Sequence, residues 1–176
     1  MLLSEDHRAI QDAIRDYVQG EIAPYAAEWD KSHHFPAEQL KGLAALGCYG
    51  VAVPTEYDGA GLDYLSLSLI LEEIAAGDGG TSTVVSVNNC PVCSILMGFG
   101  NEEQKQQFLK PLARGDMLGA FCLTEPHVGS EAGGLVGHGH DDGDIAVLAA
   151  GDELLDAVEH IVVAVPHSSR AQAARL

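Results

Sequence analysis

Two clusters in this sequence have the residue types of a metal or redox site. Cys90 and Cys93 form a C-x-x-C pair, a spacing found in redox pairs and in half of a zinc site. The sequence has no second cysteine pair, and this one lies in an apolar segment, so small buried side chains are the better interpretation.

His138, His140 and Asp142 match part of the H-x-H-x-D-H ligand pattern of some binuclear metallohydrolases. Gly143 stands where that pattern needs its last histidine, so we interpret the run as a solvated loop and predict no metal site. A metallohydrolase remains an alternative function, and stoichiometric binding of zinc or iron by the protein would support it.

A third candidate is the segment 119–131, GAFCLTEPHVGSE, which begins within a predicted strand at 118–123. Pro126 and Gly129 favour a tight turn that brings the backbone close to a ligand.

The elements that must position these residues are mostly helical. Ser4 is a suitable N-cap for the first helix, and Asn101 begins a capping box for the last, which Pro111 is expected to bend. β-Branched residues in 81–97 partly favour a strand, but the length of this apolar segment favours a buried helix. The predicted helices are 5–19, 22–31, 36–46, 64–76, 81–97 and 101–112, with a short extended piece at 51–54 and a loop at 58–61.

The composition changes after about Gly134, as if a different sequence were joined on. Strands are predicted at 145–148 and 161–165, with a short helix at 153–160 between them. A G-x-G-x-x-G loop is absent here, so a nucleotide-binding role has no support. If unpaired, 161–165 is a candidate aggregation segment.

The formal net charge of −17 disfavours nucleic acid and anionic membrane surfaces as partners. The acidic N-terminus does not look like a signal peptide, and we expect no apolar stretch of membrane-spanning length. These features predict a cytoplasmic protein with reduced cysteines and no membrane partner.

Two segments together resemble the acyl-CoA dehydrogenases. Residues 119–131 resemble the flavin-binding signature of that family, and AVPTEYDGAGLD at 52–63 resembles its P-E-E-Y-G-G-x-G loop. The segments LEEIA at 71–75, FGNEEQK at 99–105 and LKPLARG at 109–115 follow in the family's order and spacing. The resemblance covers residues 1 to about 134.

The resemblance implies a mainly α fold in three parts. Residues 1–116 would form the all-helical N-terminal domain, and 117–134 the start of the middle β domain with the flavin-binding motif. Residues 135–176 would be an unmatched, divergent α/β tail, either frame-shifted or disordered.

Specific residues are implied to bind ligands. Phe121, Leu123, Thr124, Gly129 and Ser130 match positions at the FAD site, and Ser130 also matches the serine that meets acyl-CoA. Backbone N–H groups and a hydroxyl there would stabilise charge that flavin reduction places near N1 and C2=O. The stretch 87–96 matches the helix whose face lines the acyl pocket.

The implied activity is FAD-dependent α,β-dehydrogenation of an acyl-CoA in fatty acid β-oxidation. Electron-transfer flavoprotein would accept the electrons, and the family enzyme would be a homo-oligomer. No Glu of this chain matches the family's catalytic base, so we assign no catalytic residue and expect a truncated, inactive form. The alternative is a non-catalytic helical binding module or a partial subunit.

Overall fold

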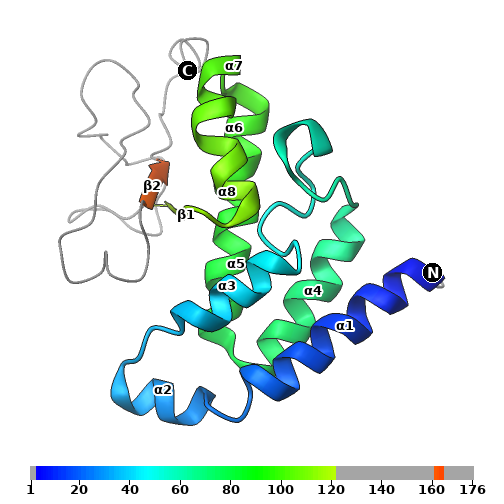
Figure 1. The fold of residues 1–176 in the computed structure, drawn as a ribbon, viewed down its shortest axis with the longest axis vertical. Helices are drawn as coiled ribbons and strands as arrows, with labels where there is room; N and C mark the ends of the chain where they lie inside the picture. The colour runs from blue at the N-terminus through cyan, green and yellow to red at the C-terminus, as the bar shows by residue number, and fades with distance from the viewer. Residues whose placement is uncertain (1–2, 122–160, 165–176) are drawn as a thin grey trace, which may run out of the picture.

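The computed structural model describes residues 3–121 and 161–164, and the structural statements below concern these residues (Figure 1). It is mainly helical, as expected, with α1 and α4 side by side on one side of the α5–α6 run and the two strands on its other side. The helices are α1 (Glu5–Glu21), α2 (Ala26–Ser32), α3 (Ala37–Ala45), α4 (Tyr64–Gly77), α5 (Gly79–Val87), α6 (Ser94–Phe99), α7 (Glu102–Gln104) and α8 (Lys110–Arg114). A 3₁₀ turn η1 (Thr55–Tyr57), two π-helical segments, η2 (Asn88–Cys93) and η3 (Lys105–Leu109), and the strands β1 (Leu118–Phe121) and β2 (Ile161–Ala164) complete the order.

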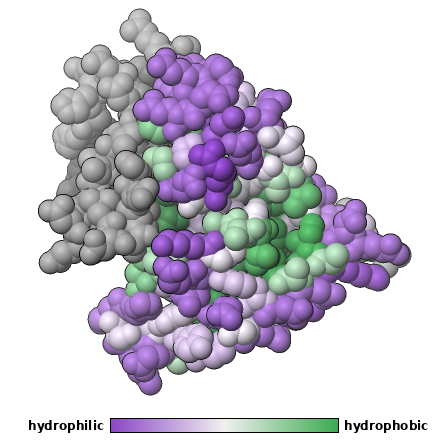
Figure 2. Space-filling model, in the orientation of Figure 1, coloured by the Kyte–Doolittle hydropathy of each residue, from purple (hydrophilic) through white to green (hydrophobic). Residues whose placement is uncertain are grey.

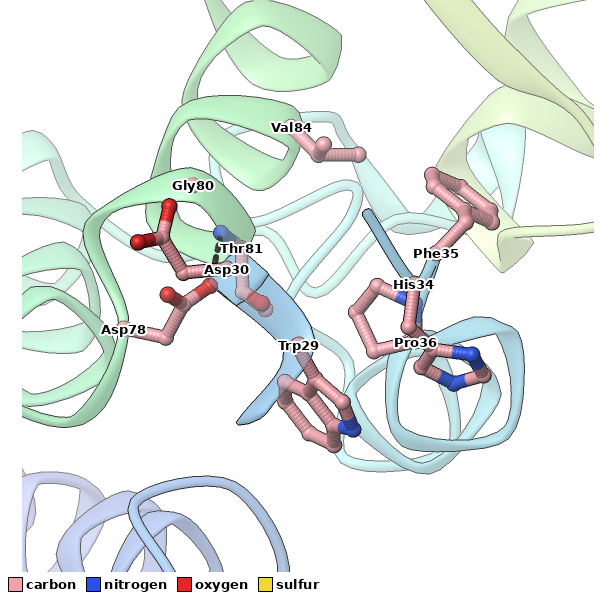
Figure 3. Close-up of a pocket in the computed structure, with 9 residues that line it drawn as sticks. All are labelled: Trp29, Asp30, His34, Phe35, Pro36, Asp78, Gly80, Thr81 and Val84. Atoms are coloured by element: carbon pink, nitrogen blue, oxygen red, sulfur yellow. Dashed lines mark hydrogen bonds between the residues drawn. The ribbon is translucent and has the colours of Figure 1, made fainter. Parts of the chain in front are cut away.

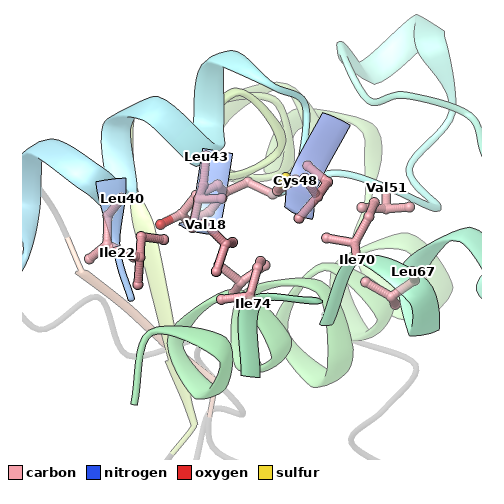
Figure 4. Close-up of a cluster of buried hydrophobic side chains, with 12 residues drawn as sticks. Val18, Ile22, Leu40, Leu43, Cys48, Val51, Leu67, Ile70 and Ile74 are labelled. Atoms are coloured by element: carbon pink, nitrogen blue, oxygen red, sulfur yellow. The ribbon is translucent and has the colours of Figure 1, made fainter. Parts of the chain in front are cut away.

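The first helix begins as its sequence predicts. The Ser4 hydroxyl accepts a hydrogen bond from the His7 backbone N–H at 3.1 Å, which satisfies one of the free donors of the first turn. The buried face of α1 carries Ile14 and Val18 and packs along α4. This interface is the centre of the domain core (Figure 4).

The core also draws in the chain around α3. Leu40 and Leu43 of α3 and Ile22 after α1 are at most 4% exposed and face Ile74 of α4. Burial of side chains of this size contributes about 1.5–3 kcal/mol each. These contacts therefore hold α3 against α1 and α4.

The segment predicted as one helix at 81–97 is helical, which confirms the choice of helix over strand. It forms a continuous helical run, α5–η2–α6, from Gly79 to Phe99. Asp78 caps it, accepting from the Thr81 N–H at 2.6 Å. The run is kinked at Cys90, whose φ and ψ are −138° and 108°, because a residue that precedes proline avoids the α conformation. The capping box at Asn101 is also confirmed, and wide π turns immediately precede Pro111, which has no N–H to donate.

Two local predictions are wrong. The second helix begins at Ala26 and not at residue 22, because Ile22 is drawn fully into the core and residues 22–25 form turns. Residues 51–53 are likewise turns and not an extended piece: the Val53 N–H donates to the Gly50 carbonyl at 3.2 Å.

The two strands form a parallel pair, with Leu118 opposite Ile161 and Phe121 opposite Ala164. Strands were predicted at 118–123 and 161–165, and the described residues confirm 118–121 and 161–164. A segment of the compositionally distinct tail therefore joins the sheet that begins after the helical domain. The strand predicted at 145–148 and the helix at 153–160 lie outside the described residues.

The helical run also corrects an expectation about membranes. By length and composition alone, Gly79–Phe99 would be long enough to cross one, although no such stretch was expected. A core helix of a globular domain has the same properties, and here α4 and β1 pack against this run. We therefore describe it as the central helix of the domain.

Candidate functional site

The candidate site is the place where β1, the start of the segment 119–131, meets the helical run. Gly119 allows the contact, because a Cβ atom there would lie 2.6 Å from Cγ1 of Val92. A glycine at this position therefore lets the strand backbone lie directly on η2.

A buried amide holds the strand in that position. The backbone N–H of Gly119 donates to Oδ1 of Asn88 at 2.8 Å, and Asn88 is 0% exposed. Nδ2 of Asn88 donates to the carbonyls of Tyr49 and Leu112 at 2.9 and 3.1 Å. One side chain thus joins η2 to the loop after α3, to α8 and to β1.

The side chain of Asn89 makes similar hydrogen bonds, but all of its partners lie within the helical domain. Oδ1 of Asn89 accepts from the Val51 N–H at 3.0 Å, and Nδ2 donates to the carbonyls of Cys48 and Val85 at 2.8 and 2.9 Å. Asn88 and Asn89 fall in the stretch 87–96, but neither was predicted individually from the sequence. Two adjacent amides inside an apolar helix were the available signal, because a buried amide needs partners.

The run turns one face outward. Thr83, Val87, Cys90, Pro91 and Ser94 are exposed or half-buried at helical spacing, whereas the opposite face is in the core. This outward face falls largely within 87–96, the stretch expected to line an acyl pocket. Its mix of methyl, thiol and hydroxyl groups suits an aliphatic ligand with few polar contacts.

Of the five predicted ligand residues, the structure describes one. Phe121 is half-buried at the end of β1. Leu123, Thr124, Gly129 and Ser130 lie outside the described residues.

The C-x-x-C pair is split between surface and core. Cys93 is 1% exposed, and burial, with a smaller contribution from Cys90, raises the pKa of its thiol to about 12. The expectation that both cysteines are buried is wrong for Cys90, which the kink before Pro91 leaves exposed. Because a neutral Cys93 thiol is a poor nucleophile and metal ligand, the split still disfavours redox or zinc chemistry.

Within residues 3–121 and 161–164, no group of three or more His, Cys, Asp or Glu side chains could hold a metal ion. The cluster of His138, His140 and Asp142 lies outside the described residues.

A cavity of about 340 Å³ opens elsewhere, between the α2–α3 loop and the start of α5 (Figure 3). Trp29, Asp30, His34, Asp78 and Thr81 are among its lining residues, and the Thr81 hydroxyl is buried without a hydrogen-bond partner. None of the described residues that line it belongs to β1, so it is separate from the candidate site.

On the face shown in Figure 2, the described surface is mostly hydrophilic, with an apolar area near its middle. Large exposed apolar side chains within the described part of the chain are Tyr25, Leu46, Leu62, Tyr64 and Phe99.

Comparisons with known proteins agree with this architecture. The family described as "Acyl-CoA dehydrogenase, N-terminal domain" matches residues 4–116. The mitochondrial short-chain specific acyl-CoA dehydrogenase of Bos taurus is 43% identical over 147 residues, covering 84% of this chain and 36% of that protein. This length exceeds 134 residues, so the likeness continues into the segment that was expected to be unmatched.

Solved structures show the same relationship. Butyryl-CoA dehydrogenase of Megasphaera elsdenii is 34% identical with a TM-score of 0.70, over 76% of this chain and 36% of that one. An acyl-CoA dehydrogenase of Bacillus anthracis, solved in complex with FAD, is 36% identical with a TM-score of 0.69, over 76% of this chain and 23% of that one.

The chain thus spans little more than a third of the length of the curated relative described above. Within that span, the family match covers the helical domain, and the fold agrees with that of solved members. This chain belongs to the acyl-CoA dehydrogenase family.

Proposed function

We propose that this chain forms the N-terminal part of an FAD-dependent acyl-CoA dehydrogenase site, which acts in the α,β-dehydrogenation of an acyl-CoA. The observation that carries the proposal is the fixed position of β1 on the helical run. The strand leads directly into the segment with Thr124 and Ser130, and it lies against the run whose outward face is exposed or half-buried.

The residues at the end of β1 fit a flavin ring edge. Successive residues of a strand direct their N–H groups to opposite edges, so the N–H groups of Gly119 and Phe121 share one edge. Asn88 holds the first of these, and the second lies two residues further along. FAD, when bound, would accept the hydride that leaves the acyl chain, and backbone donors at its edge would stabilise the resulting charge.

The acyl-CoA would lie against the outward face of the helical run. Val87 and Pro91 offer apolar contact, and Ser94, whose hydroxyl donates to the Asn89 carbonyl at 3.2 Å, lies at the C-terminal end of this face. Ser130 is proposed to contact both flavin and thioester. Electron-transfer flavoprotein as electron acceptor, a homo-oligomeric assembly and a place in fatty acid β-oxidation belong to the same proposal.

No Glu of this chain matches the base with which the family removes the α-proton. Glu73, which is buried, is bonded to Arg15 and Gln11 on the α1–α4 side of the domain. We therefore propose that these 176 residues alone are catalytically inactive. Steady acyl-CoA-dependent dye reduction by the pure chain would refute this part of the proposal.

A flavin titration tests the binding role. We expect Thr124→Val and Ser130→Ala each to weaken FAD binding by about tenfold, as loss of a donor to a charged group would. Ser68→Ala is the control, because Ser68 is exposed on α4 and donates only to the Tyr64 carbonyl at 2.9 Å. Unchanged affinity in both site variants would reject the assigned residues, and no FAD binding by the wild-type chain would reject the binding role.

The alternative role is a non-catalytic helical module. The domain has two hydrophobic clusters of its own, one around Leu43 and Ile74 and one around Val92 and Leu112, which favours independent folding. A monomer with a sharp thermal transition and no flavin affinity would support this role.

A further inference from the structure

We propose that Asn88 is the positioning residue that fixes β1, and with it the flavin-contacting edge, on the helical domain. The inference deepens the proposed function and rests on it for the flavin part. The attachment of the strand to Asn88 is a separate claim about the structure.

The first support is the complete use of the Asn88 amide. Both N–H groups of Nδ2 are donated, to Tyr49 and Leu112, and Oδ1 accepts from Gly119. The side chain is fully buried, so water cannot replace a lost partner. These contacts also fix the orientation of the amide, because a flip would place Nδ2 against the Gly119 N–H.

The second support is the short distance along the strand from Gly119 to Phe121. Asn88 holds the strand at Gly119, and the close approach to Val92 limits how far the backbone can shift toward η2. Phe121 follows two residues later on the same edge. A small rotation of the strand at Gly119 would therefore move the Phe121 N–H and everything that follows it.

The third support is the contrast with Asn89. It is also buried, at 4% exposure, and makes the same number of backbone hydrogen bonds. Its partners are Cys48, Val51 and Val85, and none of them belongs to β1. Asn89→Ala is therefore a matched control for the stability cost of removing a buried amide.

The test compares Asn88→Ala with Asn89→Ala in the full chain. We expect similar losses of stability in both. Only Asn88→Ala should raise the Kd for FAD by about tenfold or more, equivalent to about 1.4 kcal/mol. It alone should also speed hydrogen exchange of the Gly119 amide beyond the change in global stability. Equal effects of the two variants on Kd and on Gly119 exchange would overturn the inference.

A third variant separates positioning from stability. Asn88→Asp keeps an acceptor for the Gly119 N–H but loses the donors to Tyr49 and Leu112. We expect it to keep slow Gly119 exchange while losing at least as much stability as Asn88→Ala. Fast Gly119 exchange in a folded Asn88→Asp variant would contradict the role of Oδ1.

The wild-type chain provides a test that needs no variant to fold. The Gly119 and Val51 amides, which bond to Asn88 and Asn89, should both exchange slowly. A fast Gly119 amide beside a slow Val51 amide would overturn the inference. Slow exchange in a wild-type chain that binds no FAD would support attachment of the strand by Asn88 and refute the proposed flavin function.

Discussion

Arg15 donates two hydrogen bonds to Glu73 across the α1–α4 interface, from Nη2 to Oε1 at 2.6 Å and from Nε to Oε2 at 3.0 Å. Glu73 is only 8% exposed, and Gln11 donates to the same carboxylate at 2.9 Å. The pair therefore fixes the relative position of the two helices that form the centre of the core.

Arg15→Met should destabilise the domain, because it leaves a buried carboxylate with Gln11 as its remaining side-chain donor. Urea unfolding would measure the loss. Lys41→Met is the control, since its partner Glu38 is exposed and surface pairs contribute little. We expect the Arg15 variant to lose several times more stability than the control, and equal losses would contradict this interpretation.

Glycine substitutions should have opposite effects at two positions. A Cβ atom at Gly50 would lie 2.6 Å from Cβ and 2.8 Å from Cα of Ala113, so Gly50→Ala should cost about 1–3 kcal/mol. Gly20 lies in α1 with nothing within 4 Å of such an atom, so Gly20→Ala should stabilise by about 0.5–1 kcal/mol. Thermal unfolding of both variants checks the signs, and a stable Gly50→Ala protein would show that the α8 contact is looser than described.

Asp63 should make stability depend on acid pH. Hydrogen bonds from the backbone and hydroxyl of Ser66, and then from His7, hold the pKa of this carboxyl below its ordinary value. A lowered folded-state pKa means stability that is present above the unfolded-state pKa, near 3.8, and is lost as the pH falls below it. The stability gap between wild type and Asp63→Asn should therefore narrow as the pH falls from about 4 toward the lowered folded-state pKa. A constant gap in denaturant titrations across this range would argue against the hydrogen bonds that Asp63 accepts from Ser66.

Thiol labelling should separate the cysteines of the described region. Cys90 is exposed, whereas burial raises the pKa of both Cys48 and Cys93 to about 12. Iodoacetamide followed by peptide mass mapping should find Cys90 modified in the native chain and the other two only after unfolding. Fast native labelling of Cys93 would reopen the case for a reactive pair.

The helices were predictable where local signals agree. Ser4, Asn101 and Gly47 mark helix ends through caps and a positive φ, and each lies at or next to an observed boundary. The start of α2 was missed because Ile22 is drawn into the core, a tertiary contact that overrides local helix propensity.

The candidate site was predictable only in part, and for a similar reason. The segment 119–131 stands out by its turn residues, but the attachment of β1 depends on Asn88, which is 31 positions earlier in the chain. Sequence alone shows that a buried amide needs partners, and it cannot show which distant carbonyl or N–H supplies them.

The parallel pairing of β1 with β2 has a consequence for the order of folding during synthesis. The helical domain leaves the ribosome first, and β1 is synthesised before its pairing strand, Ile161–Ala164. Until that strand has been made, one edge of β1 is unpaired. An apolar edge strand in this interval is a template for pairing with another nascent chain. Attachment to the helices through Asn88 would hold β1 against its own domain during this interval. The same contact would therefore protect the nascent chain from aggregation.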